Sequence, residues 1–136
     1  MPFEIDATQN EVMLRTIAMP ADTNPAGDIF GGWLLSQMDL AGASAAVRRA
    51  KGRVVTVGMN AISFYEPVEV GDEVSCYTQV QRVGRTSLTI EIEAWKRRQD
   101  CGHRIKVTAG VFTYVKIGDD RRPVPVPPEE ETGQAG

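Results

Sequence analysis

Hydrophobic positions follow two different periods along this chain. From about Gly32 to Ala50, apolar and small residues occupy almost every position, which predicts one long buried helix. After Gly52, apolar and polar residues alternate instead, and a period of two predicts strands. With a short strand expected over 11–20, the order is strand, helix and four antiparallel strands. A sheet curled around the helix is the simplest way to bury it, so we expect an α+β fold.

Turn residues set the limits of the four later strands. We expect these strands from Val54 to Pro67 and over 72–83, 87–96 and 104–117. One side of the strand 87–96 carries Leu88, Ile90, Ile92 and Ala94, and the other carries Thr89, Glu91 and Glu93. One face of the last strand carries Ile105, Val107, Ala109, Val111 and Val115. A curled sheet leaves its edge strands unpaired, which predicts at least a dimer.

Length, charge and cysteine content restrict the class of protein. The 136 residues fit one domain, expected over 1–120, followed by a proline- and acid-rich tail over 121–136 that is extended or disordered. A formal net charge of −3 argues against general nucleic-acid binding. The first ten residues lack the pattern of a signal or transit peptide, so we expect a cytoplasmic protein. We interpret Cys76 and Cys101, too few for a disulfide framework, as structural.

The single histidine, His103, restricts the chemistry of the chain, because it falls at a predicted turn. A catalytic triad would have to use this residue. The sequence contains no nucleophile elbow, phosphate loop, dinucleotide-binding glycine motif or zinc-protease motif. We therefore expect neither a metal nor a cofactor, and we interpret His103 as a solvated turn residue.

Asp39 is the most unusual polar residue, because no other charge lies between Asp28 and Arg48. It interrupts an apolar stretch that approaches the length of a membrane span, which favours a buried helix without membrane insertion. A buried charge must be hydrogen-bonded, reach solvent through a cavity or lie at an interface. Small neighbours such as Gly42 leave space beside it. Asp39 therefore either ties the helix to a neighbouring strand or takes part in catalysis.

Glycines surround the expected start of the helix. Gly27, Gly31 and Gly32 either form a tight loop-to-helix turn or leave backbone N–H groups open to a developing oxyanion. Asp39 follows two turns later, about 10 Å along the helix axis. A partner-assisted site with these two parts suits acyl transfer to water.

The stretch NPAGDIFGGWLLSQMDLAG over 24–42, followed by GRVVTV, VGDEV and VGRTSLTI, resembles the hotdog-fold acyl-CoA thioesterases, and among them the YciA-like hydrolases. The resemblance spans about residues 11–118. It implies a long helix wrapped by a curved antiparallel sheet of five to six strands. It also implies a homodimer that builds two sites between its subunits and associates further as a trimer of dimers. The implied reaction hydrolyses acyl-CoA to a free carboxylate and coenzyme A, which is part of the substrate and not a cofactor.

The resemblance also implies residue roles by position. Asp39 matches the catalytic aspartate, acting as general base or as nucleophile, and Asn24 matches an asparagine contributed by the other subunit. The backbone N–H groups of Gly31 and Gly32 would polarise the thioester carbonyl. The segment 85–87 lies where relatives bind the nucleotide end of coenzyme A, although its residues alone indicate a plain hairpin turn.

Several alternatives remain open. The chain resembles a fold that also includes dehydratases or isomerases of acyl thioesters, and a module that binds acyl-CoA without reacting is a third possibility. The dehydratase needs a histidine paired with the acid, which the expected place of His103 disfavours. Trp33, Phe64 and Tyr65 are candidates for lining an acyl tunnel, with core packing as the favoured role. The basic run 48–53 either caps the helix or meets phosphates.

Overall fold

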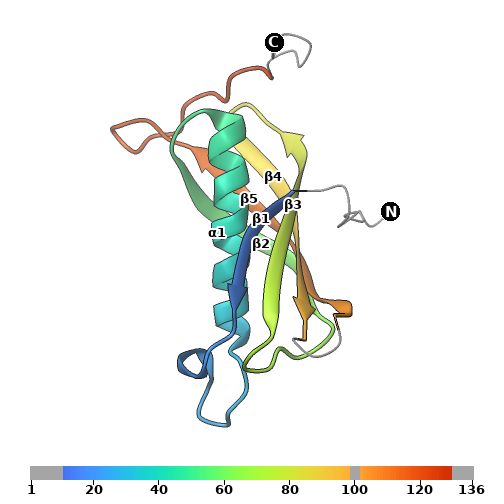
Figure 1. Ribbon diagram of the computed structural model, residues 1–136. Coiled ribbons are helices and arrows are strands. Elements are labelled where there is room, and N and C mark those ends of the chain that lie inside the picture. The colour runs from blue at the N-terminus through green and yellow to red at the C-terminus, as the bar shows by residue number, and fades with distance from the viewer. Residues whose placement is uncertain (1–10, 99–101, 130–136) are drawn as a thin grey trace.

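The computed structural model describes residues 11–98 and 102–129 and contains one long helix beside one sheet (Figure 1). The elements follow the predicted order. In sequence they are β1 (Val12–Ile17), the short 3-10 helix η1 (Pro20–Asp22), α1 (Gly31–Ala50), β2 (Val54–Phe64), β3 (Glu73–Val83), β4 (Ser87–Arg97) and β5 (Arg104–Lys116).

The five strands form one antiparallel sheet in the order β1-β3-β4-β5-β2. The chain leaves β1 at one edge, passes through α1 and enters β2 at the opposite edge. Figure 1 shows the sheet curving along one side of α1. The α+β hotdog architecture expected from the sequence is therefore confirmed, with five strands.

The inner face of the sheet forms the core against α1. Leu88, Ile90, Ile92 and Ala94 of β4 are fully buried there, as their alternation predicts. On β5, by contrast, the face toward α1 does not carry the valines at 111 and 115. It carries Phe112 and Tyr114, which are the largest fully buried side chains of the chain's described part. Aromatic volume on β5 therefore fills the space under the helix.

The helix is not covered on every side within one chain, contrary to the interpretation of a helix wrapped all round. Leu40 and Val47 of α1 are 59% and 45% exposed. On the edge strand β2, Val57 and Met59 are also exposed. A five-stranded sheet reaches only one side of a helix, so the apolar residues on the remaining side stay in contact with solvent.

Residues 121–129 of the tail follow an extended path and are hydrogen-bonded to the rest of the chain. The backbone N–H of Val124 donates to the carbonyl of Lys116 and that of Val126 to the carbonyl of Arg85. The Arg49 guanidinium donates to the Pro127 carbonyl at 2.8 Å. The last seven residues lie outside the described part of the chain.

Cys76 is fully buried in the core, and burial raises the pKa of its thiol to about 12. Its structural interpretation is confirmed, because a thiol that stays protonated is a poor nucleophile. Cys101 lies outside the described residues, as do the first residues of the turn before β5. Among the helices of the described ranges, none is long and apolar enough to cross a membrane.

Candidate active site

Two hydroxyl groups of the sheet hold the carboxylate of Asp39. Thr56 Oγ1 on β2 donates to Asp39 Oδ1 at 2.7 Å. The Tyr114 hydroxyl on β5 lies 3.0 Å from the same Oδ1 and 3.0 Å from the backbone carbonyl oxygen of Asp39. Thr56 and Tyr114 lie directly opposite each other in the pairing of β2 with β5, so both donors come from neighbouring points of the sheet.

The second carboxylate oxygen of Asp39, Oδ2, is left open by the residues that the structure describes. In the part of the chain that the structure describes, no hydrogen bond or ion pair reaches Oδ2. The side chain is half-buried and lies next to the exposed edge strand. Asp39 therefore has one oxygen fixed by the fold and one available to a substrate or a water molecule.

Gly42 makes the contact between Tyr114 and the helix possible. A Cβ atom at this position would lie 2.2 Å from the Tyr114 hydroxyl oxygen and 2.4 Å from Ile92 Cδ1. The small residue predicted to leave space beside the carboxylate does so, and the phenol occupies that space. Burial raises the pKa of Tyr114, and the charge of Asp39 and the hydrogen bond to it raise it further. The phenol therefore keeps its proton and acts as a donor.

Asn24 organises the loop that leads into α1. Its Oδ1 accepts hydrogen bonds from the backbone N–H groups of Ala26 at 3.0 Å and Asp28 at 3.1 Å. An asparagine side chain commonly folds a turn in this way. The two N–H donors of its amide nitrogen have no partner among the described residues. The loop thus fixes the direction of the side chain and leaves its donors unused.

The start of α1 is uncapped and exposed. Gly31 is the first residue of the helix, and Phe30 at the N-cap position has no side chain that could bond the first N–H groups. A Cβ at Gly31 would lie 3.5 Å from the Phe64 ring, whereas one at Gly32 would meet nothing within 4 Å. The N–H groups at this end are therefore accessible from outside the chain.

A cavity of about 360 Å³ opens beside the start of α1. It is lined by Ile29, Phe30, Gly31, Leu34, Phe64, Tyr65, Glu66, Pro67 and Val68. Phe64 and Tyr65 are 53% and 54% exposed, so the favoured interpretation of core packing is wrong for both. Phe64 is the last residue of the edge strand β2 and Tyr65 follows it, so both lie at the open margin of the sheet beside the start of α1. Trp33 is half-buried and packs against the core, as predicted.

One chain does not bring all the predicted site residues together. Eight residues separate Gly31 from Asp39, which is about 12 Å along the helix axis. No hydrogen bond joins Asn24 to Asp39 within the described ranges. A single thioester carbonyl cannot touch the helix start and Asp39 of the same chain at once.

The segment 85–87 forms the β3–β4 hairpin. The Thr86 carbonyl accepts from the backbone N–H of Lys116, and the Ser87 carbonyl accepts from that of Gly84. Arg85 is exposed, whereas Thr86 and Ser87 are half-buried. Figure 1 shows this hairpin at the same end of the molecule as the C-terminal end of α1.

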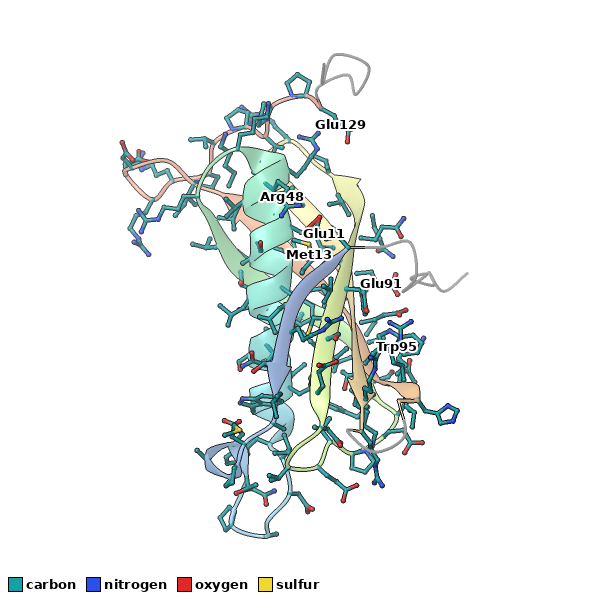
Figure 2. The ribbon with its side chains drawn as sticks, viewed as in Figure 1. Glu11, Met13, Arg48, Glu91, Trp95 and Glu129 are labelled. Atoms are coloured by element: carbon teal, nitrogen blue, oxygen red, sulfur yellow. The ribbon has the colours of Figure 1, made fainter. Side chains whose placement is uncertain are left out.

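The basic residues at the end of α1 are partly engaged within the chain. Arg48 forms an ion pair of 3.3 Å with Glu11, and Figure 2 shows the two side chains near each other beside the start of β1. His103 is exposed, as expected for a solvated turn residue. Among the described residues, no group of three or more His, Cys, Asp and Glu side chains is arranged to hold a metal ion.

Sequence reasoning missed Thr56 and Tyr114, the two partners of Asp39. Tyr114 lies in an alternating strand whose other face is more uniformly apolar, so its hydroxyl gave no separate signal. A buried acid requires hydrogen-bond donors. The signal that could have pointed to them is the pairing of β2 with β5, which places a threonine opposite a tyrosine.

Comparison with known proteins identifies the class. The model of the thioesterase superfamily matches residues 26–102, more than half of the chain, and the chain therefore belongs to this superfamily. It is 50% identical over 122 residues to the acyl-CoA thioester hydrolase YciA of Salmonella typhimurium, covering 88% of this chain and 92% of that protein.

Solved structures agree with this membership. A hexameric hotdog fold thioesterase of Campylobacter jejuni matches with a TM-score of 0.83 and 48% identity, over 86% of this chain and 90% of that one. An aspartate-to-alanine mutant of a hexameric broad specificity acyl-coenzyme A thioesterase matches with a TM-score of 0.85 and 44% identity. That match covers 93% of this chain and 91% of the other.

Proposed function

We propose that this chain is an acyl-CoA thioester hydrolase in which Asp39 is the catalytic carboxylate. The observation that supports this best is the state of Asp39, whose Oδ1 is held by Thr56 and Tyr114 while Oδ2 has no partner among the described residues. The relatives named as acyl-CoA thioester hydrolases support the substrate class.

The reaction needs few residues, because a thioester carbonyl is electrophilic and a thiolate is a good leaving group. As a general base, Asp39 takes a proton from water while the water oxygen bonds to the carbonyl carbon. The tetrahedral intermediate then expels the coenzyme A thiolate, which takes up that proton, and the carboxylic acid product loses its remaining proton to solvent. As a nucleophile, Asp39 instead attacks the carbonyl carbon and expels the coenzyme A thiolate, and water then hydrolyses the mixed anhydride to the carboxylic acid and free Asp39. Both routes require the free Oδ2.

Two subunits share each site in this proposal. Asn24 and the backbone N–H groups of Gly31 and Gly32 would face Asp39 of a partner, because within one chain the helix start and Asp39 are about 12 Å apart. The exposed residues Leu40 and Val57, adjacent in sequence to Asp39 and Thr56, are suited to contact a second copy. The hexameric neighbours support a trimer of dimers.

The two ends of the substrate have different candidate sites. The cavity beside Phe64 and Tyr65 suits the acyl chain, because its aromatic side chains are exposed to it. The hairpin residues Arg85, Thr86 and Ser87 lie at the far end of α1 and suit the nucleotide phosphates. No metal or cofactor takes part in this scheme.

The test is release of free thiol from acyl-CoA substrates of short, medium and long chain. The wild-type protein should release coenzyme A, and both Asp39→Asn and Asp39→Ala should lose most of this activity while remaining folded. Asp119→Asn, at an exposed aspartate, is the matched control. Wild-type turnover by the Asp39 variants would refute the role of Asp39.

A subunit-mixing experiment tests the shared site. Asp39→Ala and Asn24→Ala homodimers should each be inactive, whereas dimers assembled from one subunit of each variant should regain activity. In such a dimer one of the two sites keeps both native residues. If mixing restores nothing although the mixed dimers form, Asn24 and Asp39 do not act across an interface.

The dehydratase and the binding module predict other outcomes. A dehydratase would exchange water or protons at the acyl chain, and a binding module would bind acyl-CoA and release no thiol. Among the described residues the hydrogen-bond partners of Asp39 are a threonine and a tyrosine, not a histidine, which favours hydrolysis.

A further inference from the structure

The Tyr114 side chain is held on all sides by the core, although it contacts the half-buried Asp39. Its ring is fully buried in the core, and its strand β5 lies between β4 and β2. It pairs with Leu88 on one side and with Thr56 on the other. Only the hydroxyl leaves the apolar layer, and it ends within 3.0 Å of two oxygen atoms of Asp39.

The helix is shaped to receive this hydroxyl. Gly42 lies three residues after Asp39, on the adjacent turn, and any side chain there would overlap the phenol oxygen. A tyrosine that served only to fill the core would not need its hydroxyl group against the helix backbone. The glycine and the tyrosine together therefore point to a requirement for this particular contact.

We propose that Tyr114 is a positioning residue, whose hydroxyl fixes both the carboxylate and the backbone of Asp39 and so directs the free Oδ2 toward the substrate. This inference rests on the proposed catalytic role of Asp39. Thr56 holds the same oxygen, but it lies on the exposed edge strand β2. Tyr114 lies on the inner strand β5, and its buried ring is fixed by core packing. A displacement of about 1 Å at a reacting group can cost roughly 100-fold in rate, so a fixed carboxylate matters.

The chemical state of the phenol agrees with this role. Burial, followed by the nearby charge of Asp39 and the hydrogen bond, raises the pKa of Tyr114, so the group stays protonated in the native protein. Tyr114 is therefore a permanent donor. Its hydroxyl contacts two oxygen atoms of Asp39, so we expect its effect on turnover to pass through that residue.

Tyr114→Phe tests the proposal, because it removes one oxygen atom and keeps the ring. We expect kcat for acyl-CoA hydrolysis to fall roughly 10- to 100-fold while KM changes less than about twofold. Tyr77→Phe is the matched control: Tyr77 is also buried, but its hydroxyl accepts a hydrogen bond from Arg104 on the outer side of the sheet. Its kcat should stay at the wild-type value.

The double variant Asp39→Asn/Tyr114→Phe separates positioning from a general structural role. If Tyr114 acts through Asp39, the double variant should be no slower than Asp39→Asn alone. An additional loss equal to that of the single tyrosine variant would overturn the proposal, as would a wild-type kcat for Tyr114→Phe. Thermal unfolding of each variant shows that the rates belong to folded protein.

The proposed function can fail separately. If Asp39→Asn hydrolyses acyl-CoA at the wild-type rate, the catalytic role of Asp39 is refuted and the positioning role falls with it. If Asp39→Asn is inactive and Tyr114→Phe is fully active, the catalytic role stands and only the positioning role is refuted.

Discussion

Two carboxylates of this chain are held in opposite ways. Glu93 on β4 is 1% exposed, accepts a hydrogen bond from Trp95 Nε1 at 3.0 Å, and has the Lys106 ammonium 3.5 Å from its Oε2. Trp95 is labelled in Figure 2 on the side of the sheet away from α1. Asp39 is only half-buried, has no cation beside it among the described residues, and keeps one oxygen free.

The difference shows that burial alone does not mark a functional acid. Lys106 compensates the charge of Glu93 and Trp95 donates to its Oε1, although its buried Oε2 accepts no hydrogen bond from the described residues. Asp39 has two hydroxyl donors that fix its direction, and no cation of the described ranges compensates its charge. A base or a nucleophile requires an oriented acid that a substrate can reach and that no cation neutralises, whereas a fully buried acid paired with a cation stabilises the sheet.

Exchanging each acid for its amide should give the largest contrast. Asp39→Asn should lower turnover by about 10²–10⁴-fold, the usual contribution of a general base, and change the unfolding temperature little. Glu93→Gln should leave turnover per folded molecule unchanged and lower stability by about 1–3 kcal/mol, because Lys106 loses its counter-charge. Thiol release and thermal unfolding of both variants measure this. Equal effects on turnover would remove the distinction between the two acids.

Filling two glycines should produce the next largest contrast. A Cβ at Gly42 or at Gly110 would approach a side-chain atom to 2.2 Å, the Tyr114 hydroxyl in one case and Ile62 Cδ1 in the other. Both alanine variants should lose about 1–3 kcal/mol of stability through overpacking. Only Gly42→Ala should also lose turnover, by roughly tenfold or more, because it displaces the donor of Asp39. Equal losses of turnover would show that Tyr114 has no special effect.

Removing an aromatic side chain from the cavity should have a smaller effect. Phe64→Ala should raise KM for long acyl-CoA by roughly tenfold, as expected for a lost apolar contact, and should affect short chains less. Ile105→Ala, at another exposed apolar residue outside the cavity lining, is the control. A chain-length profile identical to that of the wild type would place the acyl chain elsewhere.

The smallest expected effect concerns the β3–β4 hairpin. Arg85→Ala should raise KM for acyl-CoA by up to about fivefold, the range of an exposed ion pair, with kcat unchanged. The effect should shrink at high salt and vanish for an acyl thioester that lacks the nucleotide. Arg82→Ala, at an exposed residue of β3, is the control. An equal effect on the substrate without a nucleotide would argue against phosphate binding by Arg85.

The fold was largely predictable, because local periodicity determines helices and strands. The side of β4 with alternating aliphatic residues is the side that forms the core, and the uncharged segment around Asp39 is the helix. The prediction of which apolar side chains are buried failed at the margins of the sheet, because burial there depends on how far the sheet extends. Core packing is the expectation for Phe64 and Tyr65, but they lie at the end of the edge strand β2 and remain exposed.

The sequence by itself determined one helix, its strands and the single acid that interrupts the helix, because each follows from residues close together in the chain. The donors of that acid were decided by tertiary structure. Thr56 lies 17 positions from Asp39 and Tyr114 lies 75 positions away. They meet because the antiparallel pairing of β2 with β5 places them opposite each other under α1. That register results from the packing of the whole sheet, so no local pattern reveals which hydroxyl groups hold the acid.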